Sequence, residues 1–443
     1  MKKAHLRERL RAKFFAADNY DPRILILGLG TLGGGVGVAK FFAELGYSVT
    51  VTDLRSKKDL KKSLSILKQY RHIRYVLGKH DKRDIRDADL IVKNPSVPLT
   101  SPFILEAKKL RIPITSDADI FLSVMPHERI IGVTGTKGKT TTTLLIRHLL
   151  GKDAIAVGVP GVSFFDILQQ KKMPRWIVAE LSSFDLDLVT QGPSIAVITS
   201  LFADHLNRYT SFAAYAKAKM HIVLQHTRKD RSFVWYDRES TRYFPKTYNG
   251  RLMLVSERQM PEYEKHASWR IARPAIALAV AVARSTGVPS SILKRRLLSF
   301  DAPTGRLEVV RKTRNIVFID DTTSTNPGSA AFSLAAVARE WRDITIITGG
   351  EDKKFPEKDI RAYANAIKKY HPTIILLPGS FSDRIKKYIG AVKIVNSMQK
   401  AVSLAIGAHG VVVLLPGAAS FNIFRNEYDR SAQFQRAVKR LRA

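Results

Sequence analysis

The sequence contains no cysteine, which excludes disulfide bonds, thiolate catalysis and cysteine-ligated zinc. It also lacks a long uncharged apolar run, because charged residues interrupt every such stretch well short of a membrane span. The N-terminus has no apolar core typical of a secretory signal. These absences fit a reducing compartment, and we expect a cytoplasmic protein without a membrane partner.

Acidic residues are scarce. The chain has 39 Asp and Glu residues against 73 Lys and Arg residues, which gives a formal net charge of +34. Such a charge suggests either nucleic-acid binding or a basic surface around sites for small anions. The basic residues are spread along the whole chain, without interleaved aromatic residues that would stack bases. We therefore expect no nucleic-acid partner.

The length of 443 residues predicts two or three domains, since a single core stops growing below that size. A hydrophobic content of 45% is ordinary for a globular protein. Residues 1–20 form a basic, helix-favouring extension with no core of its own. The rest alternates strand and helix patterns, so we predict an α/β fold with boundaries near residues 118 and 303.

A glycine-bearing loop is the strongest motif. An apolar run over residues 129–133 predicts a buried strand, and residues 144–150 have helical periodicity. Between them lies a phosphate-binding sequence: Gly135, Thr136, Lys137, Gly138, Lys139, Thr140 and Thr141. Backbone N–H groups and a helix N-terminus in such a loop bind phosphate, with Lys139 on the β- and γ-phosphates and Thr140 on Mg²⁺. Val133 stands where the general motif has glycine, so this is a shorter variant.

The predicted N-terminal domain, residues 1–117, carries a second glycine motif. A strand over residues 23–27 is followed by three glycines, and a strand over 48–52 ends in Asp53. The glycines are Gly28, Gly30 and Gly33. This pattern is typical of a diphosphate site with an acid that contacts a sugar or base, and an NAD enzyme is one alternative. Further strands are predicted over 75–77, 90–92 and 112–115, with the loop around Asn94 at a strand's carboxyl end.

The predicted central domain, residues 118–302, places polar residues after its strands. A strand over 176–180 ends in Glu180, and one over 195–199 leads into Asp204 and His205. A helix then carries Tyr215 and Lys219. A carboxylate, a threonine and a histidine at adjacent strand ends are what a Mg-nucleotide site needs. Taken singly, Glu180 reads equally as a capping acid, His205 as a loop histidine and Lys219 as a solvated helix lysine.

The predicted C-terminal domain, residues 303–443, opens near Arg306. Its strands are predicted over 316–319, 344–347, 374–377 and 411–415. Polar residues again follow the strand ends, where sites of open α/β sheets form. They include Asp320, Asp321, Thr325, Asn326, Gly349, Gly350, Lys353 and Ser420.

Together these motifs resemble the Mur ligases, the ATP-dependent amide-forming enzymes of peptidoglycan precursor synthesis, over nearly the whole chain. The glycine loop, Glu180 to Phe184, Asp204 to Leu206, and Lys219 occur in the family's order and spacing. The C-terminal motifs resemble the branch that adds D-glutamate to UDP-N-acetylmuramoyl-L-alanine.

The resemblance implies three α/β domains: a Rossmann-like domain for the UDP-sugar, a central P-loop ATPase and a Rossmann-like C-terminal domain for the amino acid. It implies ATP and two Mg²⁺ ions, with Lys139, Glu180, His205 and Lys219 in catalysis and Thr140, Glu180, His205 and Lys219 at the metals. Lys219 matches the family's carbamylated lysine. Arg306 and Asp321 would hold nucleotide phosphate or ribose.

For the other substrates the resemblance implies two groups of ligands. Gly28, Gly30, Gly33, Asp53, Arg55 and Asn94 would bind the UDP-sugar. Lys353 and Ser420 would bind the glutamate side chain. We expect a monomer.

Several residues depart from the family pattern. The stretch that helps hold ATP aligns with residues 271–275, where both usual asparagines are absent and the second is Ala275. Other departures are Val159, Thr323, Gly305 and Glu427. They leave open a ligase for another amino acid, such as L-glutamate. The charge of +34 and the lost asparagines also leave open a non-catalytic or nucleic-acid-associated descendant.

Overall fold

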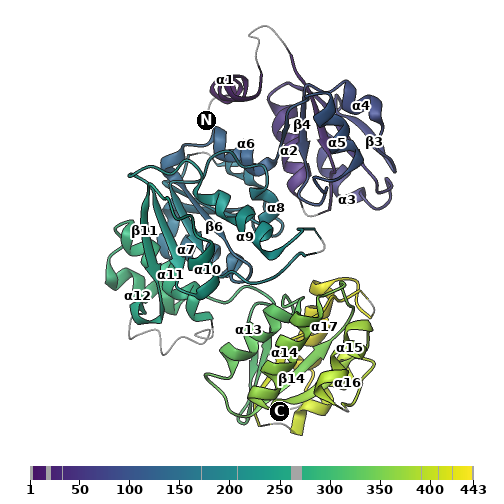
Figure 1. The fold of residues 1–443 in the computed structure, drawn as a ribbon, viewed down its shortest axis with the longest axis vertical. Coiled ribbons are helices and arrows are strands. Elements are labelled where there is room, and N and C mark those ends of the chain that lie inside the picture. The colour runs from purple at the N-terminus through teal and green to yellow at the C-terminus, as the bar shows by residue number, and fades with distance from the viewer. Residues whose placement is uncertain are drawn as a thin grey trace.

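The structure is a computed structural model. It describes residues 3–15, 21–31, 33–170, 172–206, 208–260, 272–390, 392–407, 409–421 and 423–441. Parts of two predicted features, residues 1–2 and 16–20 of the extension and Ile271 of the stretch over 271–275, lie outside this set. Figure 1 shows three α/β parts in chain order, coloured purple and blue, teal, then green and yellow.

The N-terminal sheet is fully parallel, with strand order β3-β2-β1-β4-β5. Its strands are β1 (Arg23–Leu27), β2 (Ser48–Asp53), β3 (Arg74–Leu77), β4 (Leu90–Lys93) and β5 (Ile114–Thr115). Four of the five residues of β1 are buried, as its continuous apolar sequence requires for a central strand covered on both faces. Its helices are α2 (Gly34–Glu44), α3 (Lys61–Leu67), α4 (Lys82–Arg86) and α5 (Pro102–Lys109).

The central sheet is also parallel, in the order β11-β10-β9-β6-β8-β7. Its strands are β6 (Ile130–Thr134), β7 (Ala154–Val157), β8 (Trp176–Glu180), β9 (Ile195–Ile198), β10 (Arg231–Trp235) and β11 (Arg251–Val255). Its helices are α7 (Lys139–Leu150), α8 (Ser183–Leu186), α9 (Phe212–Met220), α10 (Arg238–Tyr243), α11 (Arg273–Ser285) and α12 (Ser290–Leu298). Strand β6 lies between β9 and β8, so the carboxyl ends of three motif-bearing strands are adjacent.

The C-terminal sheet has the order β12-β13-β16-β14-β15, with β12 antiparallel to β13 and the other pairs parallel. Its strands are β12 (Glu308–Lys312), β13 (Ile316–Asp320), β14 (Ile344–Gly349), β15 (Thr373–Leu377) and β16 (Gly410–Leu414). Its helices are α13 (Pro327–Val337), α14 (Glu357–Tyr370), α15 (Ser380–Ile389), α16 (Met398–Leu404) and α17 (Glu427–Lys439).

Two helices connect the N-terminal and central parts. Helix α6 (Asp117–Val124) follows β5, and the N-terminal helix α1 (Lys3–Phe14) packs on it. Leu6 and Leu10 of α1 are buried in a hydrophobic cluster that continues from the N-terminal sheet through α6 into the central sheet. The predicted extension therefore joins a shared core.

Most strand predictions are confirmed within one or two residues. Strands β7, β10 and β11 were not predicted. The helix after the glycine loop begins at Lys139, five residues earlier than the apolar periodicity that starts at Leu144. Its first turn is a run of threonines, which the hydrophobic pattern cannot mark. Within the described part of the chain, no helix has the length and apolarity needed to cross a membrane.

Candidate active site

The glycine loop follows β6 and turns sharply into α7. Gly135 and Gly138 have φ angles of 148° and 92°, which glycine adopts without strain. A Cβ atom on Gly135 would lie 2.0 Å from the Thr199 hydroxyl oxygen, so a side chain has no space there. The loop consequently needs glycine at this position, and its backbone N–H groups are presented at the N-terminus of α7.

Lys139 is the first residue of α7, and its side chain folds back over the loop. Its Nζ donates to the carbonyl oxygens of Gly135 and Thr136 at 3.1 and 3.3 Å. Thr140 and Thr141, the next two residues, are buried in the first turn. This cation, held only by neutral carbonyls, is available to phosphate oxygens.

Glu180 ends β8 beside the loop. Its Oε2 atom is buried and has no hydrogen-bond partner among the residues that the structure describes. Burial raises the pKa of Glu180, while the Lys139 charge and the Thr140 hydroxyl oppose that shift. An anionic oxygen left without a partner fits a cation site, since oxygen is the ligand that Mg²⁺ prefers. No three carboxylate or histidine side chains among the described residues group closely enough to hold a metal alone.

Lys219 lies on α9 and is 1% exposed, which contradicts the alternative of a solvated helix lysine. Its Nζ donates to the Gly135 carbonyl at 2.8 Å and lies 4.7 Å from the centre of the Tyr215 ring. Burial, followed by repulsion from Lys139, lowers its pKa well below the usual lysine value. A neutral amine next to the phosphate loop is the form that reacts with carbon dioxide to give a carbamate.

His205 stands at the edge of the same site. Its backbone has φ 53°, and its side chain is 43% exposed. Its ring packs edge to face against Phe184 at 4.8 Å and lies 3.5 Å from the Asp204 carboxylate. His205 and Glu180 line one cavity.

A cavity of about 230 Å³ surrounds the loop. Residues of the loop, Glu180, Ala272, Pro274 and Ala275 line it from the central part, and Arg306, Asp321 and Phe332 line it from the C-terminal part. The structure therefore brings the predicted cofactor-binding residues together around one space. Ala272 and Ala275, at the positions of the two absent asparagines, line this cavity.

A second cavity, of about 660 Å³, adjoins the first. Its lining comes from all three parts: the loop at Asn94, the segment from Gly158 to Phe164, and Thr325 with Glu427. Glu180, Arg306, Thr323 and Thr325 line both cavities. A ligand in one is thus within reach of a ligand in the other.

The N-terminal glycine loop is built around Asp53. This carboxylate accepts hydrogen bonds from the N–H groups of Gly30 and Arg55 at 2.9 and 2.8 Å. Asn94 closes over the loop, so a Cβ atom on Gly28 would lie 2.9 Å from the Asn94 Cβ. Gly33 caps α2 with φ 97°. The six residues predicted for the UDP-sugar therefore lie on adjacent strand ends of one sheet.

The residues predicted for the amino acid lie in the C-terminal part. Lys353 donates to the Thr325 hydroxyl at 3.3 Å, and Ser420 is buried beside the backbone bridge between Glu351 and Ala419. Burial lowers the pKa of Lys353, and the charges of Asp204 and Glu427 oppose that shift. Glu427 thus lies in electrostatic reach of the cation expected to bind a dicarboxylate.

Sequence reasoning missed several charged residues between the N-terminal and central parts. Arg208 donates to the carbonyls of Ser96 and Pro95 and stacks 4.6 Å above the Phe184 ring. Asp117 and Asp185 line the larger cavity, and burial together with the neighbouring Asp185 charge raises the pKa of Asp117 to about 7. Asp185 and Arg208 lie next to the motifs at Glu180 and Asp204, but only the tertiary fold shows that they line this cavity.

Comparisons with known proteins identify the family of this chain. Family models for the MurD-like Mur ligase N-terminal domain and the Mur ligase middle domain match residues 22–116 and 133–268. A UDP-N-acetylmuramoylalanine–D-glutamate ligase of Roseiflexus sp. (strain RS-1) is 33% identical, over 94% of this chain and 98% of the relative. The chain belongs to the Mur ligase family. A relative of the same name from Borreliella burgdorferi (strain ZS7) is 32% identical over 94% of this chain and 97% of its own.

Solved Mur ligases share the fold at low sequence identity. UDP-N-acetylmuramate-alanine ligase MurC of Thermotoga maritima superposes with a TM-score of 0.54 and 19% identity, over 94% of this chain and 99% of its own. MurF ligase of Thermotoga maritima, solved in complex with ADP, gives a TM-score of 0.55 and 15% identity, over 96% of this chain and all of its own. The mixed α/β architecture with parallel sheets is therefore that of Mur ligases.

Proposed function

We propose that this Mur ligase adds D-glutamate to UDP-N-acetylmuramoyl-L-alanine in peptidoglycan precursor synthesis, with ATP hydrolysis and an acyl-phosphate intermediate. The observation that carries the proposal is the pair of adjoining cavities that share Glu180 and Arg306. One contains the phosphate loop, and the other joins all three parts of the chain. A carboxylate in the larger cavity would thus meet a phosphate in the smaller one.

The residues suit transfer of a phosphoryl group to a carboxylate. All the reacting species are anionic, so catalysis depends mainly on positioning and charge neutralisation. Lys139 would hold the β- and γ-phosphates, and Arg306 would neutralise charge from the other cavity wall. Thr140, Glu180, His205 and a carbamylated Lys219 would hold two Mg²⁺ ions, which supply further charge neutralisation when bound. The amino group then attacks the acyl phosphate, and phosphate leaves.

We further propose that the three sheets correspond to three domains with the boundaries predicted near residues 118 and 303. The N-terminal domain would bind the UDP-sugar through Gly28, Gly30, Asp53 and Asn94. The parallel order of its strands supports this role, because diphosphates bind at strand carboxyl ends in such sheets. Lys353 and Ser420 would bind the incoming glutamate.

A phosphate-release assay tests the proposal. ATP, Mg²⁺ and UDP-N-acetylmuramoyl-L-alanine are supplied with D-glutamate, L-glutamate or other amino acids in turn. We expect turnover that depends on D-glutamate. Turnover with L-glutamate alone would favour the alternative ligase suggested by Glu427, whose charge lies near Lys353. Absence of turnover with every amino acid would refute a catalytic role.

Carbamylation of Lys219 has its own test. Depletion of carbon dioxide and bicarbonate should lower activity, because the buried neutral amine then lacks its carboxylate form. Lys219→Ala should lose activity and partly regain it with added short carboxylates such as formate. If neither treatment has an effect, Lys219 is a buried amine bonded to the Gly135 carbonyl and plays no part at the metals.

A further inference from the structure

Lys137 lies in the glycine loop, yet its side chain reaches the C-terminal part. Its Nζ donates to Asp321 Oδ2 at 2.8 Å and to the Ser324 hydroxyl. The lysine side chain is 14% exposed and the aspartate side chain is fully buried. The Lys137 side chain is therefore paired with a buried carboxylate of the C-terminal part.

The backbone of Lys137 is fixed independently of that ion pair. Its N–H donates to the Ser200 hydroxyl at 3.0 Å, and its carbonyl accepts from the hydroxyls of Thr199 and Ser200 at 2.6 and 2.9 Å. Both residues directly follow β9. The backbone of Lys137 is thus fixed to the central sheet. Any group that its Nζ binds is therefore held in a fixed place relative to that sheet.

Asp321 extends this connection to the linker between the central and C-terminal sheets, residues 303–307. Its second oxygen, Oδ1, accepts from the N–H of Leu307 at 3.2 Å. Leu307 has φ 53°, a left-handed conformation that is unfavourable for leucine and needs support from its surroundings. Its buried side chain and the bond to Asp321 supply that support.

Arg306 precedes Leu307 and lines both cavities. Its guanidinium makes one hydrogen bond, to the carbonyl of Thr304 at 3.3 Å, among the contacts of the described residues. A long side chain with one weak neutral contact takes its position mainly from its backbone. The backbone at residues 306–307 is in turn held by Asp321.

We propose that Lys137 is a positioning residue that holds Arg306 at the reacting phosphate, by way of Asp321 and the Leu307 N–H group. It differs in role from Lys139, whose Nζ bonds only to carbonyls of its own loop. The loop thus carries one lysine for the phosphates and another for the C-terminal part. This inference rests on the proposed ligase function.

The test compares Lys137→Met, Arg306→Ala and the double variant by steady-state phosphate release, with ATP varied and the other substrates saturating. We expect Lys137→Met to lower kcat by about 10- to 100-fold with little change in the KM for ATP, because Arg306 is displaced while the phosphate loop is intact. In the Arg306→Ala background, Lys137→Met should cause no further loss. Lys137→Arg, which retains the ion pair, should recover most of the activity. Lys152→Met, at an exposed lysine just after α7, is the matched control.

Further variants keep the result interpretable. If Lys137→Met folds poorly because Asp321 is left buried without its cation, the neutral pair Lys137→Met with Asp321→Asn should fold and show the same loss of kcat. Hydrogen exchange at the Leu307 amide should accelerate in Lys137→Met but not in Lys152→Met, and this measurement does not depend on any reaction.

Two outcomes would overturn the inference. One is a full additional loss of kcat from Lys137→Met in the Arg306→Ala background, and the other is a raised KM for ATP with kcat unchanged. Either would mean that Lys137 acts on the nucleotide directly. A wild-type protein without turnover would refute the proposed function instead, and the exchange measurement at Leu307 would still decide whether Lys137 fixes the linker.

Discussion

The central sheet meets its two neighbours through interfaces of different chemistry. The N-terminal interface has a large apolar core beside the Arg208 contacts: Phe41 of α2 stacks on Phe165 at 4.2 Å, and one buried cluster runs through both sheets. Ser163 packs so closely against α2 that a Cβ atom on Gly37 would lie 1.9 Å from its hydroxyl oxygen. In the C-terminal interface, by contrast, the described residues share no buried apolar cluster between the two sheets.

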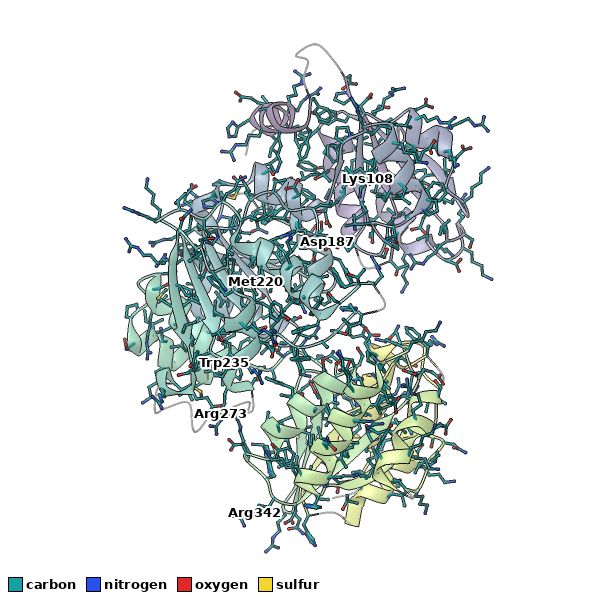
Figure 2. All side chains as sticks on the ribbon, in the orientation of Figure 1. Lys108, Asp187, Met220, Trp235, Arg273 and Arg342 are labelled. Atoms are coloured by element: carbon teal, nitrogen blue, oxygen red, sulfur yellow. The ribbon has the colours of Figure 1, made fainter. Side chains whose placement is uncertain are left out.

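Ion pairs dominate the C-terminal interface instead. Besides Lys137 and Asp321, Arg273 of the central part bonds to Glu340 at 2.7 Å and to Glu257 at 3.2 Å, and Arg339 pairs with Glu257. Figure 2 shows Arg273 at the end of the central part that faces the C-terminal part, and Asp187 where the central part meets the N-terminal part.

The difference indicates where the molecule moves. Close-packed apolar surfaces resist separation, because every displaced contact exposes area to water. Polar interfaces exchange their partners with water at lower cost and allow domain motion. The nucleotide cavity lies at the polar interface. We therefore expect the C-terminal part to move on nucleotide binding while the N-terminal and central parts stay together.

The largest effect should come from Lys139→Ala, which spares both interfaces. We expect turnover to fall by about 10³-fold or more, since the cation on the β- and γ-phosphates is lost. The free energy of unfolding should hardly change, because the Nζ bonds only to carbonyls of its own loop. Phosphate release and urea denaturation measure the two quantities. Retained turnover would remove Lys139 from the mechanism.

The second-largest effect should come from a variant at the apolar interface. Phe165→Ala should lower the free energy of unfolding by about 3 kcal/mol, because a buried aromatic ring is replaced by a cavity. The N-terminal and central parts should unfold together at a lower urea concentration. Phe421→Ala is the control, since that ring is 68% exposed. If Phe165→Ala lowered the free energy of unfolding as little as the control does, contacts other than this packing would hold the two parts together.

Sequence patterns predicted the strands and the phosphate loop well, because buried parallel strands are continuous apolar runs and the loop needs glycines at fixed positions. They failed where a role depends on tertiary contact. Nothing around Lys137 distinguishes it from a phosphate-binding lysine until Asp321, distant in sequence, is placed beside it. The edge strand β11 was missed for a related reason, since its sequence alternates little and it is mostly exposed.

Lys219 could be predicted as a site residue only through the family resemblance, because an alanine-rich helix carrying two lysines is equally typical of a solvated surface. Its 1% exposure follows from the position of α9 against the loop. The sequence pattern specifies which residue types occur near a strand end, whereas the packing determines which of them lose water.

The smallest effect should come from the polar interface. Arg273→Ala should lower the free energy of unfolding by about 1 kcal/mol. The side chain is partly exposed, so water replaces some of the lost interaction. Its effect should appear as faster hydrogen exchange in the C-terminal part and should shrink when ionic strength is raised to about 1 M, where ion pairs are screened. Arg342→Ala, at an exposed arginine of the same part, is the control, and the exchange of α2 should not change in either variant. A large decrease in the free energy of unfolding that does not depend on salt would show that this interface is as rigid as the apolar one.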